Sequence, residues 1–274
     1  MNSVAMLRFR VARFVCGLAV SLAPTIAELF AQSNVLGEML RIPGGPFVMG
    51  SSNGPEDERP QHRLEVAEFF IDRTKVTNAQ FAMFLNAKGP VGPQGDKYFD
   101  IDDSDARVHR PDGNWAADVG FENNPVVEVS WYGAVAFCRW AGKRLPTEAE
   151  WEKAARGTDG RKYPWGEEGP NRTRAHFGAG WNDLKPVGSF PHGASPYGLL
   201  DAAGNGWEWV SSAYRPYPYN AQDGREDLNK DMVRGTRGGG HDARIEELTT
   251  TQRGRHVSRN PHGGHHNISF RCAR

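Results

Sequence analysis

Two long segments of this chain, residues 89–124 and 158–200, show neither a helical nor a strand period in their apolar residues. The chain also holds 32 glycines and 18 prolines among its 274 residues, so much of its backbone must form turns and loops. Loops of this length are uncommon in a compact domain unless a metal, a disulfide or dense aromatic packing holds them. We therefore expect one α+β domain with low regular secondary structure and at least one such clamp.

Three short helices carry clear start signals. Thr77 is followed three residues later by Gln80, and Thr147 by Glu150, which is the spacing of a capping box. Ser130 precedes the apolar segment 131–141 and can cap it. Strands are expected in two pieces around the Pro-Gly-Gly turn of residues 40–50 and in the alternating segment 64–71. Each predicted helix ends at a glycine: Gly89, Gly142 and Gly157.

Residues 1–33 have the layout of a secretory signal peptide. Arg8, Arg10 and Arg13 precede an almost wholly apolar stretch at residues 14–24, and small residues follow at Ala31-Gln32-Ser33. The apolar stretch is too short to cross a bilayer as a permanent span, and the alternative interpretation is a buried N-terminal helix. We predict that residues 34–274 form the mature domain, exported to the periplasm or secreted, without a stable membrane anchor.

The charge and cysteine content exclude several classes of protein. The chain has 33 basic and 33 acidic side chains, so its charge does not favour binding to nucleic acid. Its three cysteines are too few for a disulfide scaffold and lack the paired spacing of a zinc site. All eight tryptophans lie between Trp115 and Trp209, a density that argues against disorder.

A series of motifs follows in a fixed order from about residue 38 to the C-terminus. The two most specific are KRLPTEAEWE at residues 143–152 and GNGWEW at residues 204–209. With the other motifs, they resemble the formylglycine-generating enzyme (sulfatase-modifying factor) family. These others are IPGGPFVMG (42–50), KVTN (75–78) with Phe81, NPVV (124–127), VSW (129–131), YPWG (163–166), YGL (197–199), RGG (237–239) and FRCA (270–273).

The resemblance implies a single compact formylglycine-generating-enzyme-type domain, related to the C-type-lectin-like architecture. Members of this family convert a substrate cysteine to formylglycine with copper and oxygen, and they bind structural calcium. The family also includes iron-dependent sulfoxide synthases, a tailoring protein of pyoverdine maturation and members without known chemistry. Membership of the family therefore does not decide the function.

The resemblance also implies a calcium ion at the GNGWEW turn. Its ligands would be Asp201, the carbonyls of Gly204 and Gly206, and the carboxylate of Glu208, because a hard cation prefers oxygen ligands. The alternative is that Glu208 caps a segment or pairs with a nearby arginine. The family's other calcium site falls near His176, a poor ligand for a hard cation, so we expect that site to be damaged.

The cysteines argue against the family's best-known reaction. Family enzymes carry two catalytic cysteines after the Arg-Gly-Gly motif, where they bind Cu(I) as thiolates. Counting from that motif places the two positions at Ala243 and Leu248, and neither residue can bind copper. The family also has a disulfide between the helix after VSW and the FRCA tail, which implies a Cys138–Cys272 disulfide here. The alternative is two buried free thiols.

The segment that lines the family's active-site groove is rich in histidine and charge in this chain. The candidate catalytic residues are His241, Asp242, Arg244, Glu246 and Glu247. Of these, His241, Asp242 and Glu246 or Glu247 would form either an oxygen/nitrogen site for a divalent metal, with any transition metal of unknown identity, or an acid–base pair. The alternative is that they are solvated loop residues. Other histidines and arginines of the segment match no established ligand pattern, although the arginines suit an anionic ligand: His256, His262, His265, His266, Arg253, Arg255 and Arg259.

The sequence leaves three functions open. The first is an exported, oxidoreductase-like tailoring or maturation protein that acts on a peptide or small metabolite without the copper–thiolate site, as in siderophore maturation. The second is a non-catalytic module that binds a peptide or partner in the old substrate groove. The third, conventional formylglycine generation on sulfatases, requires thiols that Ala243 and Leu248 do not supply.

Overall fold

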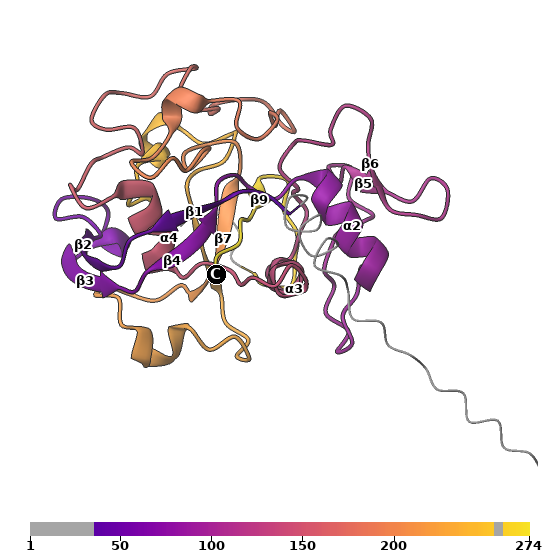
Figure 1. Ribbon diagram of the computed structural model, residues 1–274, viewed down its shortest axis with the longest axis horizontal. Coiled ribbons are helices and arrows are strands. Elements are labelled where there is room, and N and C mark those ends of the chain that lie inside the picture. Colours follow the sequence, from indigo (N-terminus) through magenta and orange to yellow (C-terminus); the bar gives the residue numbers. More distant parts are fainter. Residues whose placement is uncertain (1–35, 255–259) are drawn as a thin grey trace, which may run out of the picture.

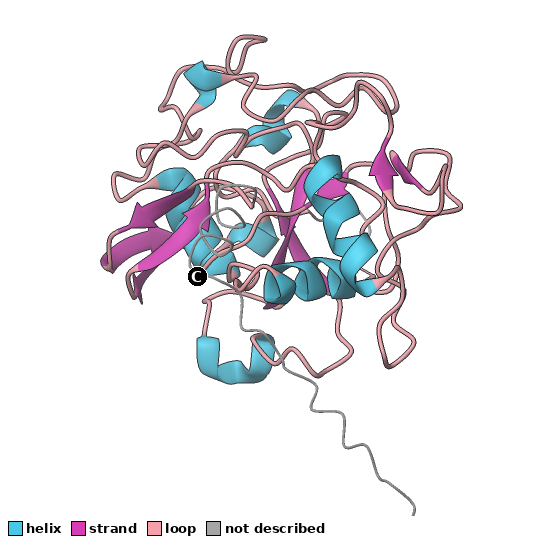
Figure 2. Cartoon of the chain, turned by 45° about the vertical axis from the view of Figure 1, so that its right-hand side comes forward, coloured by secondary structure: helices cyan, strands magenta, loops and turns pink. Residues whose placement is uncertain are grey.

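The computed structural model describes residues 36–254 and 260–274. Within these residues, short strands and helices are joined by loops that make up most of the chain (Figures 1 and 2). The strands form three two-stranded antiparallel sheets and one three-stranded sheet, in which β7 lies between antiparallel β8 and parallel β9. The strands are β1 (Met39–Ile42), β2 (Gly45–Met49), β3 (His62–Val66), β4 (Phe69–Asp72), β5 (Val108–His109), β6 (Ala116–Ala117), β7 (Trp207–Ala213), β8 (Arg234–Arg237) and β9 (Ile268–Ser269).

The three predicted helices are present and begin at the predicted caps. Thr77 and Thr147 each take part in a complete capping box, and the Ser130 hydroxyl accepts a hydrogen bond from the Gly133 amide. The helices are α2 (Asn78–Lys88), α3 (Trp131–Trp140) and α4 (Glu148–Arg156). Four further helical turns lie in the loops: η1 (Glu56–Glu58), η2 (Pro191–Gly193), η3 (Ala221–Arg225) and η4 (Ile245–Leu248).

The strand predictions are confirmed in one place and corrected in another. Residues 40–50 form parts of β1 and β2 around the predicted turn. Residues 64–71 were expected to form one strand, but the chain leaves β3 at Val66 and begins β4 at Phe69, so that β3 pairs with β2 and β4 pairs with β1. The segment 89–124 also contains the small β5–β6 hairpin, which the absence of a sequence period did not indicate.

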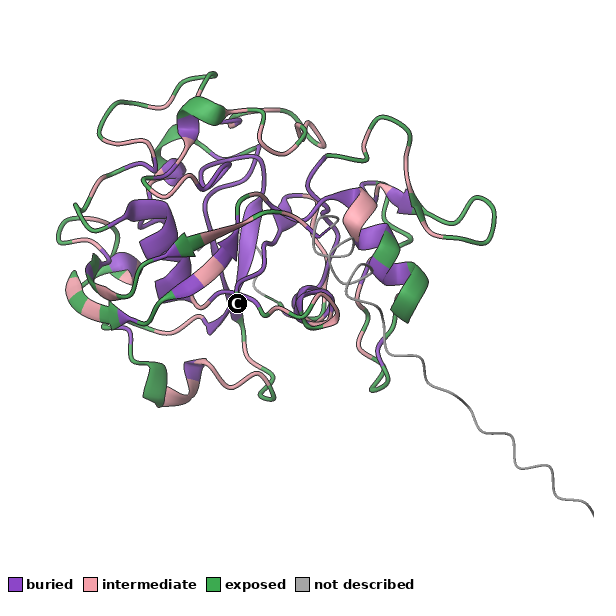
Figure 3. Cartoon of the chain, viewed as in Figure 1, coloured by how far each residue is buried: buried purple, intermediate pink, exposed green. Residues whose placement is uncertain are grey.

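Buried aromatic packing holds the loops and helices together. One apolar cluster joins α2 and α3 through Phe81, Phe84 and Phe137, and a second surrounds Trp151 of α4. Strand β7 is buried along its whole length, at the centre of the molecule (Figure 3). The loop before α3 approaches this helix closely, since a Cβ atom at Gly133 would lie 2.1 Å from the Tyr98 carbonyl oxygen.

A disulfide between Cys138 of α3 and Cys272 near the C-terminus confirms the predicted pairing. Its two half-cystines are 134 residues apart in the sequence, and both side chains are fully buried. The alternative of two free thiols is therefore wrong. Closing so long a loop restricts the unfolded chain by about 4–5 kcal/mol in the chain-entropy model, so this bond is one of the expected clamps.

Two predictions fall on residues outside the described ranges. These are the signal peptide at residues 1–33 and the roles suggested for His256 and its neighbours Arg255 and Arg259. Within the described residues, no helix combines the length and the apolar character needed to cross a membrane.

Candidate functional site

The predicted calcium ligand Glu208 lies in a fully buried cluster of charges. Its carboxylate accepts hydrogen bonds from Nε and Nη2 of Arg271 at 2.6 and 2.8 Å and from Nε1 of Trp151 at 2.9 Å. The ammonium of Lys75 lies 3.0 Å from the same carboxylate. Burial alone would raise the pKa of Glu208, but Arg271 and Lys75 lower it to about 2. Glu208 is thus an ion-pair partner, which was the alternative to calcium binding.

Lys75 also reaches the backbone oxygens that calcium would need. Its Nζ donates to the carbonyl of Asp201 and, at 3.3 Å, to the carbonyl of Gly204. The Asp201 carboxylate accepts the Gly188 amide at 2.6 Å through one oxygen, while its other oxygen is buried without a partner. A cation among Asp201, Gly204, Gly206 and Glu208 would have to displace this ammonium. The residues therefore do not fit a calcium ion in this conformation.

A second buried charge cluster joins α4 to β8 and to the loop after it. Arg237 pairs with Glu148 at 3.3 Å and with Glu152 at 2.5 Å, and Arg253 pairs with Glu148 at 2.7 Å. Arg156 completes the cluster by pairing with Glu152 at 3.1 Å. Arg253 is therefore a structural residue, and its guanidinium is not free to bind an anionic ligand.

The two positions that resemblance aligns with the catalytic cysteines are closed off from solvent. Ala243 and Leu248 are buried in a small apolar cluster with Tyr163, Ala175 and Ala203. The sequence has three cysteines, of which Cys138 and Cys272 form the disulfide and Cys16 lies outside the described residues. The described part of the chain therefore offers no thiol for a copper–thiolate centre.

His241 is the most unusual of the candidate catalytic residues. Its imidazole is fully buried, and neither ring nitrogen has a hydrogen-bond partner. Its ring lies edge-on to that of His266, with 6.0 Å between centroids, and His266 stacks on Trp181 at 3.6 Å. Burial lowers the pKa of His241, which keeps this imidazole neutral near pH 7.

Asp242 lies beside this histidine pair. One of its carboxylate oxygens is 3.6 Å from Nε2 of His266, and the amide of Asn267 donates to both oxygens at 3.1 and 3.3 Å. His241, Asp242, His266 and Trp181 therefore form one site, called the imidazole site below. Neutral imidazole nitrogens suit proton transfer or a borderline transition metal.

The structure separates the other three candidates from the imidazole site. Glu247 accepts the Arg244 amide at 2.8 Å and so caps the turn η4, and the exposed Arg244 and Glu246 side chains lie 3.5 Å apart. These three residues line a different cleft of about 470 Å³, which also contains Arg161 and Lys162. The five candidates therefore lie at two places, because the turn after Asp242 directs η4 to this second cleft.

Among the described histidines, His262 and His176 have other partners. His262 pairs with exposed Asp231 at 3.0 Å and packs on Tyr132. His176 contacts the Asp183 carbonyl and lines a cleft of about 490 Å³ with Arg172 and Lys185, and burial lowers its pKa. This cleft adjoins the imidazole site, because its Ala179 amide donates to the His241 carbonyl at 2.9 Å.

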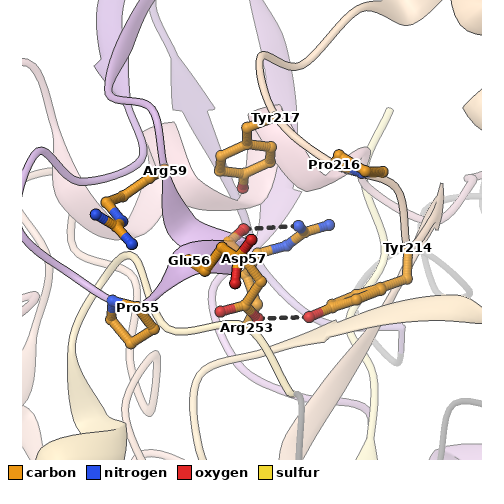
Figure 4. Close-up of a pocket in the computed structure, with 8 residues that line it drawn as sticks. All are labelled: Pro55, Glu56, Asp57, Arg59, Tyr214, Pro216, Tyr217 and Arg253. Atoms are coloured by element: carbon orange, nitrogen blue, oxygen red, sulfur yellow. Dashed lines mark hydrogen bonds between the residues drawn. The ribbon is translucent and has the colours of Figure 1, made fainter.

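Sequence reasoning missed a cavity of about 610 Å³ next to the second charge cluster (Figure 4). Tyr214 donates to the Asp57 carboxylate across it, and Arg253 donates to the Asp57 carbonyl at 2.8 Å. No motif joins these residues, which come from parts of the chain more than 150 positions apart. The lining residues are Pro55, Glu56, Asp57, Arg59, Tyr214, Pro216, Tyr217 and Arg253.

An acidic group far from the predicted sites was also missed. Asp103, Asp105 and Glu128 each offer a carboxylate oxygen, and these oxygens lie within 4.8 Å of one another. Three carboxylates at this separation can hold a metal ion. The signal available in the sequence was the run of acidic residues at positions 100–105, although nothing in the sequence placed Glu128 beside it.

These features define a loop-rich α+β domain that is held by a disulfide, aromatic packing and buried ion pairs. The family model of the sulfatase-modifying factor enzyme 1-like domain matches residues 26–274, and the chain belongs to this family. A formylglycine-generating enzyme of Streptomyces coelicolor is 37% identical over 286 residues, an alignment that covers 85% of this chain and 88% of the relative.

Two other relatives differ from that enzyme in length or in described role. A serine/threonine-protein kinase pkn1 of Chlamydia caviae is 38% identical over 244 residues, covering 86% of this chain, but this chain spans 38% of the relative's length. The structure of PvdO from Pseudomonas aeruginosa matches with a TM-score of 0.68 and 25% identity, covering 89% of this chain and 96% of PvdO.

Proposed function

We propose that this protein is an exported, oxidoreductase-like tailoring or maturation protein that acts on a peptide or a small metabolite at the imidazole site. The observation that carries the proposal is the buried imidazole of His241, both of whose nitrogens lack a partner. A buried polar group without a partner costs free energy, so its retention in a folded domain favours a functional role. The motifs resemble a family that includes a tailoring protein of pyoverdine maturation, and the likeness to PvdO is compatible with this class of function.

The environment of His241 suits acid–base work. Its lowered pKa makes the imidazole a base that is unprotonated near neutral pH. The Asp242 carboxylate lies 3.6 Å from Nε2 of His266, and Trp181, which is largely exposed, offers a flat apolar surface beside it. We propose that a substrate stacks near Trp181 and that His241 and His266 accept or hold its protons.

The adjoining cleft favours a substrate with an anionic group. Arg172 and Lys185 border it together with His176. Asp183 neutralises part of this charge, because its carboxylate contacts Lys185. A carboxylate of a peptide or metabolite would balance the remaining positive charge by pairing with Arg172.

The disulfide supports export, since such bonds persist outside the reducing cytosol. It also removes the third function of conventional formylglycine generation by a copper–thiolate centre. That centre requires two thiolates, whereas both described cysteines are consumed in the Cys138–Cys272 bond.

A non-catalytic binding module is the second candidate, and one observation favours it. Within the described residues, the side chains of His241, His266 and Asp242 do not bring three ligand atoms together as a metal site does. A module of this kind would bind a peptide or partner in a cleft such as the one lined by Arg244, Glu246 and Glu247.

The experiment compares the extracellular peptides and metabolites of cells that lack the gene with those of cells complemented by wild-type, His241→Ala or His262→Ala protein. His262 is the matched control because its side chain is exposed and outside the imidazole site. We expect a mass-shifted product that the wild type and His262→Ala restore and His241→Ala does not. If deletion changes no product, or if His241→Ala restores the product fully, the tailoring function at this site is wrong.

A further inference from the structure

We propose that Asp103, Asp105 and Glu128 form a binding site for a hard divalent cation of the Ca²⁺ type, separate from the family-implied set at Asp201 and Glu208. The three carboxylates come from two distant segments, the loop that precedes β5 and the residue three positions before α3. One oxygen from each lies within 4.8 Å of the others. The site is therefore assembled by the fold.

Glu128 is the observation that points to a ligand. Its side chain is 3% exposed, and no described residue donates a hydrogen bond to its carboxylate or forms an ion pair with it. The carboxylate is directed at Asp103 and Asp105, although an unpartnered buried carboxylate would gain by turning toward solvent or a cation. The backbone fixes this direction, because the Glu128 amide donates to the His265 carbonyl at 3.1 Å and its carbonyl accepts the Asp100 amide at 2.9 Å.

The local charges leave the site in need of a cation. Lys97 is the nearby basic residue, but its ammonium pairs with Asp100 at 2.7 Å. The carboxylates of Asp103, Asp105 and Glu128 lie close enough to repel one another, and the side chain of Glu128 is buried. A divalent cation among three carboxylates removes both the repulsion and the cost of burying the charge.

The donor set favours Ca²⁺ over Mg²⁺ and over softer metals. All the ligand atoms are carboxylate oxygens, whereas copper and zinc prefer sulfur or imidazole. Calcium accepts several carboxylates from a flexible loop, and Mg²⁺ usually keeps most of its waters and binds one or two carboxylates. Asp103 is exposed, so the site has a side open to solvent through which water can complete the coordination.

Occupation of the site would also restrain the imidazole site. The Asn182 amide contacts the Asp105 carboxylate, and the neighbouring Trp181 stacks on His266. The Glu128 amide donates a hydrogen bond to the carbonyl of His265, the residue before His266. A cation that fixes Asp105 and Glu128 therefore fixes both sides of the Trp181–His266 stack.

The test is calorimetric titration of Ca²⁺ into the chelator-treated, disulfide-bonded protein, with Mg²⁺ and Zn²⁺ titrated separately. We expect about one Ca²⁺ per chain, with Mg²⁺ binding at least tenfold more weakly. Glu128→Gln and Asp105→Asn should each weaken Ca²⁺ binding tenfold or more, because each removes a charged ligand and keeps its shape. Asp102→Asn is the matched control on the same exposed loop, outside the set of three, and should change the affinity less than threefold.

Absence of Ca²⁺ binding to the wild type overturns the proposal. So does unchanged affinity in a folded Glu128→Gln protein, with near-ultraviolet circular dichroism as the check of folding. Tighter binding of Zn²⁺ than of Ca²⁺ contradicts the assignment to a hard cation. His241→Ala should keep Ca²⁺ binding, so that failure of the tailoring function and failure of the cation site are measured separately.

Discussion

Buried polar groups are paired with opposite charges in one region of this molecule and lack such partners in another. Around β7 and α4, buried glutamates meet cations, as Glu208 meets Arg271 and Lys75, and Glu148 meets Arg253. At the imidazole site both ring nitrogens of His241 are buried without a partner, and in the acidic loop the buried Glu128 faces two other carboxylates, those of Asp103 and Asp105.

This difference separates the framework from the candidate sites. Breaking a buried pair leaves an uncompensated charge, so paired groups fix the geometry of the fold. An unpartnered buried group instead weakens the fold until something outside the chain satisfies it. The unpaired groups are therefore where a ligand is expected, and the paired ones are where it is not.

The largest effect is expected from removal of the disulfide that ties α3 to the tail carrying Arg271. The Cys138→Ala/Cys272→Ala double variant should lose about 4–5 kcal/mol of unfolding free energy, because the 134-residue loop is no longer closed in the unfolded chain. Urea unfolding of the oxidised wild type and the variant measures this loss. A difference below about 1 kcal/mol would show that the disulfide contributes little to the framework.

The Glu208→Gln substitution should be nearly as damaging. It leaves the buried Lys75 and Arg271 without a counter-charge, at a cost of about 3–5 kcal/mol. The control is Glu68→Gln, which removes an exposed ion pair with Arg41 and should cost less than about 1 kcal/mol. Equal midpoints for these two variants in urea unfolding would contradict the framework role of Glu208.

The same chemical change at Glu128 should have the opposite sign. With Ca²⁺ chelated, Glu128→Gln should stabilise the fold by about 1–3 kcal/mol at pH 8.5, because it removes a buried carboxylate without a partner. The pKa of Glu128 is raised to about 8, so ionisation costs stability as the pH rises from 4.5 through 8. Urea midpoints at pH 5 and 8.5 measure both points, and destabilisation at pH 8.5 would count against an unpaired Glu128.

The smallest effect is expected at His241. Its pKa is lowered by burial, so the unfolded chain binds the proton more readily, and folding stability falls as the pH drops through the ordinary histidine range near 6.5. His241→Phe should reduce this acid sensitivity between pH 7.5 and 5.5, whereas exposed His262→Phe should not. Equal acid sensitivity of wild type and His241→Phe would mean that His241 has a partner in solution.

Local sequence signals predicted the helices well, because a cap acts over three or four residues and Thr77, Ser130 and Thr147 each bond within that range. The disulfide was predicted from the resemblance of two distant motifs to those of the family. By contrast, the ammonium of Lys75 lies among the expected calcium ligands although Lys75 is 126 residues from Asp201 in the sequence. Nothing in the sequence near the GNGWEW turn indicates this contact. Glu128 and Asp105 likewise meet only through the tertiary fold.

The separation of the candidate catalytic residues has a similar cause. His241 and Glu247 are six positions apart and looked like members of one groove, but the chain turns between them and buries Ala243 at the bend. The spacing of two residues in a loop shows that they are close along the chain, but it does not predict where their side chains point. The imidazole site also needed Trp181, whose stacking on His266 no motif recorded.

Residues 270–273 complete three parts of the framework at once. Phe270, Arg271, Cys272 and Ala273 are fully buried, and they supply a core aromatic ring, the counter-ion of Glu208 and one half of the disulfide. One segment of four residues thus contributes to the apolar core, to the buried ion pairs and to the covalent clamp at once. A chain truncated before Phe270 would therefore have an incomplete core and no Cys138–Cys272 bond.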